Sequence, residues 1–468
     1  MVKARSACLG DADGMVPAGH FAGLPRLENP MLRISHYLRA LVQPDAAPVA
    51  GARGTPGQQP PVVIWNLLRR CNLTCKHCYA TSADSPFRNE LNTIEALRVI
   101  DDLYAAGVRV LILSGGEPLL RPDLFQLAGH ARAQGFFVAL SSNGTLIDET
   151  NIERIANAQF DYVGVSIDGL QDVHDAWRQM AGSFAAALRA IDLCRQHDIR
   201  VGLRTTLTQH NTPQLPAILS LMRDHDVQKF YLSHLNYSGR GKRSSKFDAH
   251  HAMTRDAVHL LFERAWEDIE AGLDTDFVTG NNDADAILLL HWVRQRMPQH
   301  GQRLAQMLRA WGGNASGGGI ANIDNTGDVH PDTYWWQHQV GNVRRQTFRE
   351  LWLDQPDPLL QQLRQHPRPV GGRCAECHWL PVCNGNTRTS AWAAGDLWGE
   401  DPGCYLTDEE ITQPALLCRA KSDADPSADF AVDSAVDPAT APAAASAATP
   451  AFTAAAAAIS PSAAISAS

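Results

Sequence analysis

The chain has 468 residues, a formal net charge of −9, and 44% apolar against 19% charged residues. This composition is that of a globular protein with a sizeable core, and no basic stripe interleaved with aromatic residues occurs, which excludes a typical nucleic-acid-binding protein. Residues 1–20 lack the apolar segment of a signal peptide, and no stretch of about 18 apolar residues occurs, so we expect a cytoplasmic protein that does not enter a membrane.

The N-terminal half is expected to form helices and parallel strands. Apolar residues at helical spacing predict a short amphipathic helix over 29–42, and a Pro/Gly/Ala-rich stretch predicts a linker from 44 to about 60. Six short apolar runs then alternate with helical patterns, which indicates parallel βαβ units. The expected strands are 62–68, 108–113, 136–141, 162–167, 199–206 and 229–234, and the expected helices lie near 92–106, 122–134, 148–157, 183–196 and 214–225.

These units favour an α/β fold, a partial (β/α)6 barrel, over a doubly wound sheet, because each unusual motif falls just after a strand. Barrels of this kind build their active site from the loops at the carboxyl ends of the strands. A cysteine loop at 71–78 follows the first strand, and 114–118, 142–145 and 166–169 come at the ends of the next three. We therefore expect all four segments to meet at one rim.

The C-terminal half is expected to be less regular. Helical patterns lie near 254–271 and 285–310, and Gly and aromatic residues over 311–343 predict hairpins. The region 372–405 has too few apolar repeats to bury a core unaided, so a metal centre would supply the missing stability. The Ala/Ser/Pro/Asp composition after residue 421 predicts a disordered tail. The expected divisions are 1–60 (helix and linker), 61–235 (barrel), 236–310 (bridging helical region), 311–420 (cysteine-containing domain) and 421–468 (tail).

Closely spaced cysteines in a reducing compartment indicate metal ligands, and seven of the ten cysteines form two groups. Of the rest, Cys194 lies among apolar residues and is expected in the core. The first group, Cys71, Cys75 and Cys78, occupies one tight loop. Three thiolates can hold three irons of a four-iron cluster, which leaves one iron open to a further ligand. A zinc site completed by His77 or by a distant residue is the alternative.

The Cys-x3-Cys-x2-Cys spacing followed by Tyr79 resembles the signature of the radical S-adenosylmethionine (SAM) superfamily. The resemblance implies that the open iron of a [4Fe-4S] cluster chelates SAM and that Tyr79 lies among the cofactor-binding residues. It also implies that an electron from the reduced cluster splits SAM, and that the resulting deoxyadenosyl radical abstracts a hydrogen from the substrate. An electron donor such as a flavodoxin or ferredoxin is the implied partner.

Other segments resemble the SAM-facing loops of the same superfamily. Gly115, Gly116 and Glu117 follow the second strand, where two glycines let a ligand approach the backbone and a carboxylate can accept from an ammonium group. An ordinary turn would explain these residues in isolation, but beside the cysteine loop the resemblance implies contact with the SAM amino group. Common turn chemistry and a structural ion pair are the alternatives for the remaining implied SAM contacts, which are Asn143, Ser166 and Arg178.

A second group of four cysteines lies nearer the C-terminus: Cys374, Cys377, Cys383 and Cys404. Four thiols make a closed site, for which structural zinc is the alternative. The spacing resembles the auxiliary-cluster domain called SPASM, which follows the barrel in many radical SAM enzymes. Thr387 stands where that pattern has a further cysteine, so the resemblance supports one auxiliary [4Fe-4S] cluster and not two. Cys418 is near enough in sequence to replace Cys404 as the fourth ligand.

Residues 25–419 resemble the radical SAM family of haem d1 biosynthesis, notably over 29–33 and 235–241. The resemblance implies a tetrapyrrole substrate, didecarboxysirohaem, from which two propionate side chains are removed on the way to the oxo groups of haem d1. The alternatives are another tetrapyrrole enzyme that decarboxylates propionates to vinyl groups, a SPASM peptide maturase, and a noncatalytic iron–sulfur or zinc scaffold.

The composition is compatible with a flat, anionic macrocycle. Nine of the eleven tryptophans lie after residue 250, and Arg240, Lys242 and Arg243 follow the sixth strand on the expected rim. Core packing would explain the tryptophans equally well, and a solvated loop would explain the basic run. His234 ends the sixth strand and could ligate the iron of the macrocycle, although a structural role is commoner for a lone histidine.

Overall fold

The computed structural model describes residues 31–43 and 59–412, all of which belong to one compact unit within residues 1–420. The predicted linker up to about residue 58, the predicted tail after 421 and the alternative ligand Cys418 lie outside the described residues. Those expectations therefore remain predictions.

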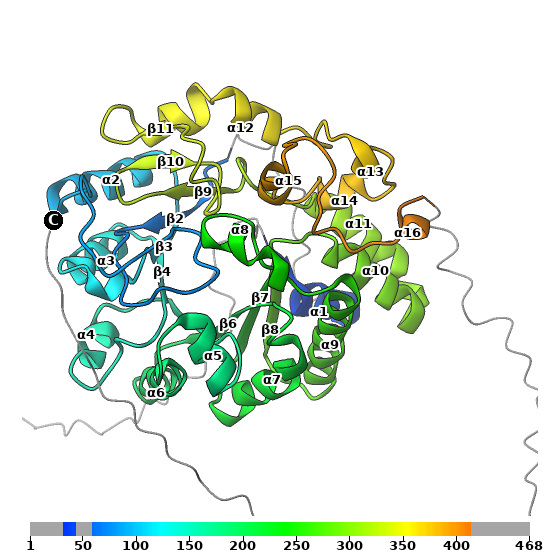
Figure 1. Ribbon diagram of the computed structural model, residues 1–468, viewed down its shortest axis with the longest axis horizontal. Coiled ribbons are helices and arrows are strands. Elements are labelled where there is room, and N and C mark those ends of the chain that lie inside the picture. Colours follow the sequence, from blue (N-terminus) through cyan, green and yellow to red (C-terminus); the bar gives the residue numbers. More distant parts are fainter. Residues whose placement is uncertain (1–30, 44–58, 413–468) are drawn as a thin grey trace, which may run out of the picture. The chain divides into compact units, whose positions relative to one another are not determined.

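One mixed sheet organises this unit (Figure 1). Its centre is a run of parallel strands in chain order, β2 to β8, as successive βα units require. The six predicted strands are confirmed to within a few residues. Their bounds are β2 Val62–Asn66, β3 Val110–Ser114, β4 Phe137–Ser142, β5 Tyr162–Ser166, β6 Val201–Thr206 and β7 Lys229–Ser233.

The next parallel strand, β8 (Asp276–Gly280), lies inside the region predicted to be a helical bridge, and the sequence analysis missed it. Its first residue is a carboxylate that is 1% exposed, which is atypical of a buried strand. Arg33 lies 3.0 Å from this carboxylate and Lys229 lies 3.6 Å from it. Because Arg33 belongs to the distant strand β1 (Leu32–Arg33), antiparallel to β8, local sequence could not reveal the compensation.

Helices connect the strands of the sheet at nearly the predicted places. Helix α2 (Thr93–Ala105), the first of them, begins with a capping box. The Asn92 side chain accepts a hydrogen bond from the backbone N–H of Glu95, and the Glu95 side chain accepts one from the backbone N–H of Asn92. The sequence analysis missed α5 (Gln171–Arg178), a largely polar helix. The other connecting helices are α2 Thr93–Ala105, α3 Leu124–Ala133, α4 Ile152–Asn157, α6 Ser183–Gln196 and α7 Leu215–Asp224.

Further helices, which include α1 (Ile34–Val42), pack beside the β7–β8 side of the sheet (Figure 1). The stretch predicted as one helix over 285–310 is interrupted at Pro298, because proline lacks the N–H that an interior helical position donates. It consists of α10 (Asp285–Arg296) and α11 (Gly301–Trp311), which follow α9 (His251–Glu270). None of the helices in 31–43 or 59–412 combines the length and apolarity needed to cross a membrane.

The predicted hairpins of the C-terminal part extend the same sheet on its other side. β9 (Ile320–Ile323) lies parallel to β2, and β10 (Asp328–His330) and β11 (Gly341–Asn342) follow as antiparallel strands. Trp335 and Trp352 are fully buried, which confirms core packing as the role of these two tryptophans. The rest of this part consists of short helices, for which the sequence analysis gave no prediction: Glu350–Asp354, α12 Pro358–Leu363, α13 Gly372–Ala375, α14 Leu380–Cys383, α15 Thr389–Ala394 and α16 Asp408–Thr412.

Candidate active site

The first cysteine group lies in the loop after β2, at the carboxyl ends of the parallel strands. Cys71, Cys75 and Cys78 pack together with Leu73 and none of them forms a disulfide. Cys75 and Cys78 lie close enough to Cys71 to raise the pKa of its thiol. The backbone N–H of Leu73 lies 3.4 Å from the Cys71 sulfur, and that of Ser82 lies 3.5 Å from the Cys78 sulfur. Such N–H groups stabilise cluster thiolates.

Burial raises the pKa of the Cys71 thiol to about 12, and burial also raises the pKa of Cys75. Buried thiols of this kind need a metal in place of their protons to act as thiolates. In the part of the chain that the structure describes, no three side chains of His, Cys, Asp or Glu lie close enough together to bind a single metal ion. His77 does not face the thiols as a fourth zinc ligand would: its ring stacks on Trp177, and its Nε2 lies 3.4 Å from Asp168. The buried thiols and the N–H groups that face them fit a metal centre, while His77 is engaged by Trp177 and Asp168.

A buried ion pair holds the cysteine loop from the β5 side. Asp168 is 1% exposed, and its Oδ2 lies 2.6 Å from the guanidinium of Arg178, which ends α5. Burial alone would raise the pKa of Asp168, but the Arg178 charge lowers it below its usual value. The other Arg178 nitrogen, Nη1, lies 3.7 Å from the Cys75 sulfur. The structural ion pair is thus present, and the predicted SAM contact of Arg178 remains a prediction.

The glycines after β3 hold their loop against the cysteine loop. The Gly116 backbone N–H donates to Leu68, and a Cβ at Gly116 would stand 2.0 Å from the Arg70 carbonyl oxygen, so only glycine fits. At Gly115 a Cβ would stand 2.6 Å from the Leu68 carbonyl oxygen. These glycines therefore let their loop pack directly against the backbone of Leu68 and Arg70.

Glu117 is fully buried, and its carboxylate accepts hydrogen bonds from the Ser142 hydroxyl at 2.9 Å and from the backbone N–H groups of Asn143 at 2.8 Å and Leu119 at 3.2 Å. Burial raises the pKa of Glu117 to about 7. These bonds join the loops after β3 and β4. The SAM role predicted for the carboxylate is not tested by them.

The remaining predicted SAM contacts differ in how close they lie to the cysteines. The Asn143 side chain donates to Asn72 at 3.0 Å and lies 3.8 Å from the Cys71 sulfur. The Tyr79 hydroxyl accepts from Asn66 at 3.0 Å, and its ring meets Tyr334 edge-on at 5.4 Å. Ser166 ends β5, half-buried, on the same rim.

The structure also identifies a functional residue that the sequence analysis assigned differently. The basic run that contains Arg240 was interpreted either as facing substrate carboxylates or as a solvated loop, but the Arg240 guanidinium donates to the carbonyl oxygens of Cys75 at 2.7 Å and Ser82 at 2.8 Å. It therefore pins the cysteine loop. The signal was the glycine before it: Gly239 has φ +55°, and a Cβ there would stand 2.2 Å from the Tyr79 carbonyl oxygen. Lys242 and Arg243 are exposed.

The second group of cysteines is half-buried and contributed by separate short segments. Cys374 lies in α13, Cys383 ends α14, and Cys404 lies in the loop before α16. Burial and the neighbouring Cys404 and Cys377 raise the pKa of Cys383, while burial and Cys374 raise the pKa of Cys404 to about 11. The fold thus brings the four predicted ligands together.

Donors also face the sulfurs of the second group. The Gly385 backbone N–H lies 3.4 Å from the Cys383 sulfur, and the guanidinium of Arg373 lies 3.7 Å from the Cys404 sulfur. Thr387, which stands where the SPASM pattern has a further cysteine, places its hydroxyl 3.0 Å from that of Thr389.

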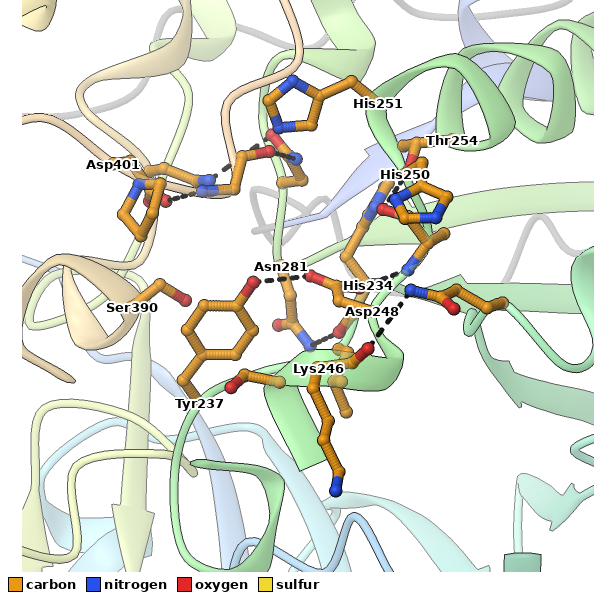
Figure 2. A pocket seen from close by; sticks show the side chains of 18 residues that line it. His234, Tyr237, Lys246, Asp248, His250, His251, Thr254, Asn281, Ser390 and Asp401 are labelled. Atoms are coloured by element: carbon orange, nitrogen blue, oxygen red, sulfur yellow. Dashed lines mark hydrogen bonds between the residues drawn. The ribbon is translucent and has the colours of Figure 1, made fainter. Parts of the chain in front are cut away.

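A cavity of about 570 Å³ opens between the barrel rim and the C-terminal segment. Its barrel wall includes His234, Tyr237, Asp248 and Asn281, and Figure 2 shows Ser390 and Asp401 across from them. Neither Asp401 nor Ser390 was singled out from the sequence, because no local pattern marks them. The remaining lining residues are Gln209, Leu235, Ser245, Lys246, Ala249, His250, His251, Thr254, Asn282, Asn386, Pro402 and Gly403.

The chain matches the family model described as "Radical SAM superfamily" over residues 65–222. It is 51% identical over 383 residues to the pre-heme d1 synthase of Dinoroseobacter shibae, covering 81% of this chain and 93% of that protein. The chain belongs to the radical SAM superfamily. It is therefore a radical SAM enzyme, and membership implies a [4Fe-4S] cluster and SAM as cofactors.

Other similarities support the same family and the fold. The chain is 41% identical to the Fe-coproporphyrin III synthase of Methanosarcina barkeri, covering 75% of this chain and 89% of that protein. It also resembles the crystal structure of Streptococcus suis SuiB bound to S-adenosylmethionine, with a TM-score of 0.58 at 15% identity over 75% of this chain and 78% of that one. This likeness confirms the predicted fold class, a radical SAM partial barrel with a SPASM-type C-terminal extension.

Proposed function

We propose that this enzyme catalyses a step of haem d1 biosynthesis, the removal of two propionate side chains from didecarboxysirohaem. The observation that carries the proposal is the 51% identity to a pre-heme d1 synthase, which extends over 93% of that protein. The similarity spans 383 residues and therefore extends well beyond the barrel segment 65–222 that the family model matches.

The cysteine groups supply the cofactor sites of this proposal. Cys71, Cys75 and Cys78 would hold the [4Fe-4S] cluster with the open iron, and the C-terminal four cysteines, with Cys404 as the fourth ligand, would hold one auxiliary [4Fe-4S] cluster. When bound, the first cluster and SAM supply a deoxyadenosyl radical. Glu117, Asn143 and Ser166 stand on the same rim and are the proposed SAM contacts, together with Tyr79, Gly115, Gly116 and Arg178.

The cavity lined by His234, Tyr237 and Asp401 is the proposed tetrapyrrole site. Its floor comes from the loops after β7 and β8, and its opposite wall comes from the segment that ends in Cys404. The segment 234–248 that lines it also carries Arg240, which pins the cysteine loop. A substrate here would lie beside the loop that carries Cys404, because Pro402 and Gly403 line the cavity.

The test is an anaerobic incubation of the reconstituted enzyme with SAM, didecarboxysirohaem and a reductant, which in the cytoplasm would be a flavodoxin or ferredoxin. Mass spectrometry should show loss of two complete propionate side chains, with deoxyadenosine formed. Products that keep two carbons of each propionate as vinyl groups would favour the alternative decarboxylation. Deoxyadenosine without any change in the tetrapyrrole would contradict the proposed substrate.

A further inference from the structure

We propose that His234 is the axial ligand of the central iron of the tetrapyrrole substrate and that Asp285 holds it in the ligating orientation. This inference rests on the proposed function. It assigns a role to a residue that neither the cysteine groups nor the SAM-facing loops use.

His234 stands at the position that a substrate ligand requires. It directly follows β7, at the carboxyl end of the parallel sheet, where barrels of this type bind their substrates. Its side chain is 9% exposed and lines the cavity, together with Asn281 and Asn282 from the end of β8 (Figure 2). The His234 side chain is therefore packed on most sides, but a ligand in the cavity can contact it.

The hydrogen bonding of the ring leaves one nitrogen available for a metal. Nε2 lies 2.9 Å from Asp285 Oδ2, and because a carboxylate accepts, Nε2 carries the proton. Nδ1 then presents its lone pair, and it makes no hydrogen bond with any residue of 31–43 or 59–412. A metal-ligating histidine characteristically donates its other ring N–H to a carboxylate, which fixes both the tautomer and the ring orientation.

Asp285 is itself held rigidly. It is fully buried, and its second oxygen accepts from the Tyr405 hydroxyl at 2.5 Å. The Tyr405 ring also stacks on His234, with 6.3 Å between centroids. Since Tyr405 follows Cys404 in the chain, this contact joins the proposed iron ligand to the loop of the auxiliary cysteine group. These contacts fix the orientation of the His234 ring before any ligand binds.

The cavity next to His234 is lined by two acidic groups as well as by the basic Lys246. Asp248 and Asp401 both line the cavity, and burial raises the pKa of each. A substrate propionate placed beside these two groups would add a third carboxyl to a poorly hydrated space. An iron cation would instead be attracted by them. Burial alone would lower the pKa of His234, but Asp285 raises it, which makes the ring a stronger donor to iron.

The experiment compares two macrocycles, didecarboxysirohaem and its iron-free counterpart, in anaerobic titrations of the reconstituted holoenzyme followed by absorption spectroscopy. His234→Gly should weaken binding of the iron macrocycle about tenfold or more and change its absorption spectrum, while binding of the iron-free macrocycle stays the same. Added imidazole should restore the wild-type spectrum in His234→Gly. Asp285→Asn should weaken binding of the iron macrocycle by about 10- to 100-fold, as expected for loss of an orienting carboxylate.

His225→Gly is the matched control, because His225 also pairs with an aspartate, Asp192, at 2.5 Å, but lies outside the cavity. It should leave both titrations unchanged. If the wild-type enzyme binds and converts didecarboxysirohaem while His234→Gly keeps the wild-type spectrum and affinity, the axial ligation is overturned and the proposed function stands. If the wild-type enzyme binds neither macrocycle, the axial ligation and the proposed function are both wrong. Should His234→Gly lose its clusters, an unchanged spectrum and affinity in Asp285→Asn would overturn the ligation.

Discussion

The two cysteine groups of this chain are built in opposite ways. The first occupies a single loop, and residues from four other segments of the barrel, such as Asn143 and Arg178, contact it. The second consists of half-buried cysteines on separate short segments of the C-terminal part, of which α14 packs against α10 and α11. The first group therefore depends on one loop and the residues that hold it, whereas the second depends on how separate segments pack together.

The largest expected effect is at the first group. Cys75→Ala should abolish reductive SAM cleavage, because two cysteines on this loop cannot present an open iron. The measurement is deoxyadenosine formed under reducing, anaerobic conditions. Cys194→Ala, in which a core cysteine outside both groups is changed, serves as the control and should retain the yield. Wild-type yields from Cys75→Ala would break the assignment of this loop.

At the second group, Cys374→Ala should remove one cluster and leave the other. The variant should lose about four irons per chain, and the spectroscopic response of the remaining cluster to SAM should persist, since the two ligand sets share no residue. Some substrate-free SAM cleavage should therefore survive, while conversion of the tetrapyrrole should fail. Loss of the SAM response in this variant would mean that the two sites are not independent.

Two arginines sharpen the comparison, because each lies 3.7 Å from a cysteine sulfur. Arg178 is paired with the buried Asp168, so Arg178→Met should leave an uncompensated buried charge and lower the free energy of unfolding by about 3–5 kcal/mol. Denaturant unfolding of the reconstituted protein measures this. The double variant Arg178→Met/Asp168→Asn should recover part of the loss, and a single variant as stable as the wild type would contradict the ion-pair account.

The smallest effect is expected at the corresponding arginine of the second group. Arg373 pairs with Asp408, whose side chain is 81% exposed, so Arg373→Met should lower the free energy of unfolding by no more than about 1 kcal/mol. The same denaturant experiment applies. A loss as large as that of Arg178→Met would show that the two sites are anchored equally firmly, against the comparison drawn above.

The sequence predicted what depends on local pattern. The six strands were found because a parallel strand covered on both faces is a short apolar run, and both cysteine groups were found because their ligands are closely spaced. Strand β8 was missed because Asp276 is neutralised by Arg33, which lies 243 residues away. The role of Arg240 was misjudged for the same reason: its partner Cys75 is 165 residues distant. The partners in such contacts cannot be read from local pattern, and at Arg240 only the preceding glycine, Gly239, gave a local signal.

The most direct test of the account is a variant in which Cys71, Cys75 and Cys78 are all replaced by alanine, reconstituted with iron and sulfide. The wild-type protein should hold about eight irons per chain and the variant about four, in a cluster whose spectrum does not respond to SAM. A variant without iron, or one whose remaining cluster responds to SAM, would contradict the claim that the C-terminal cysteines form a separate, closed site.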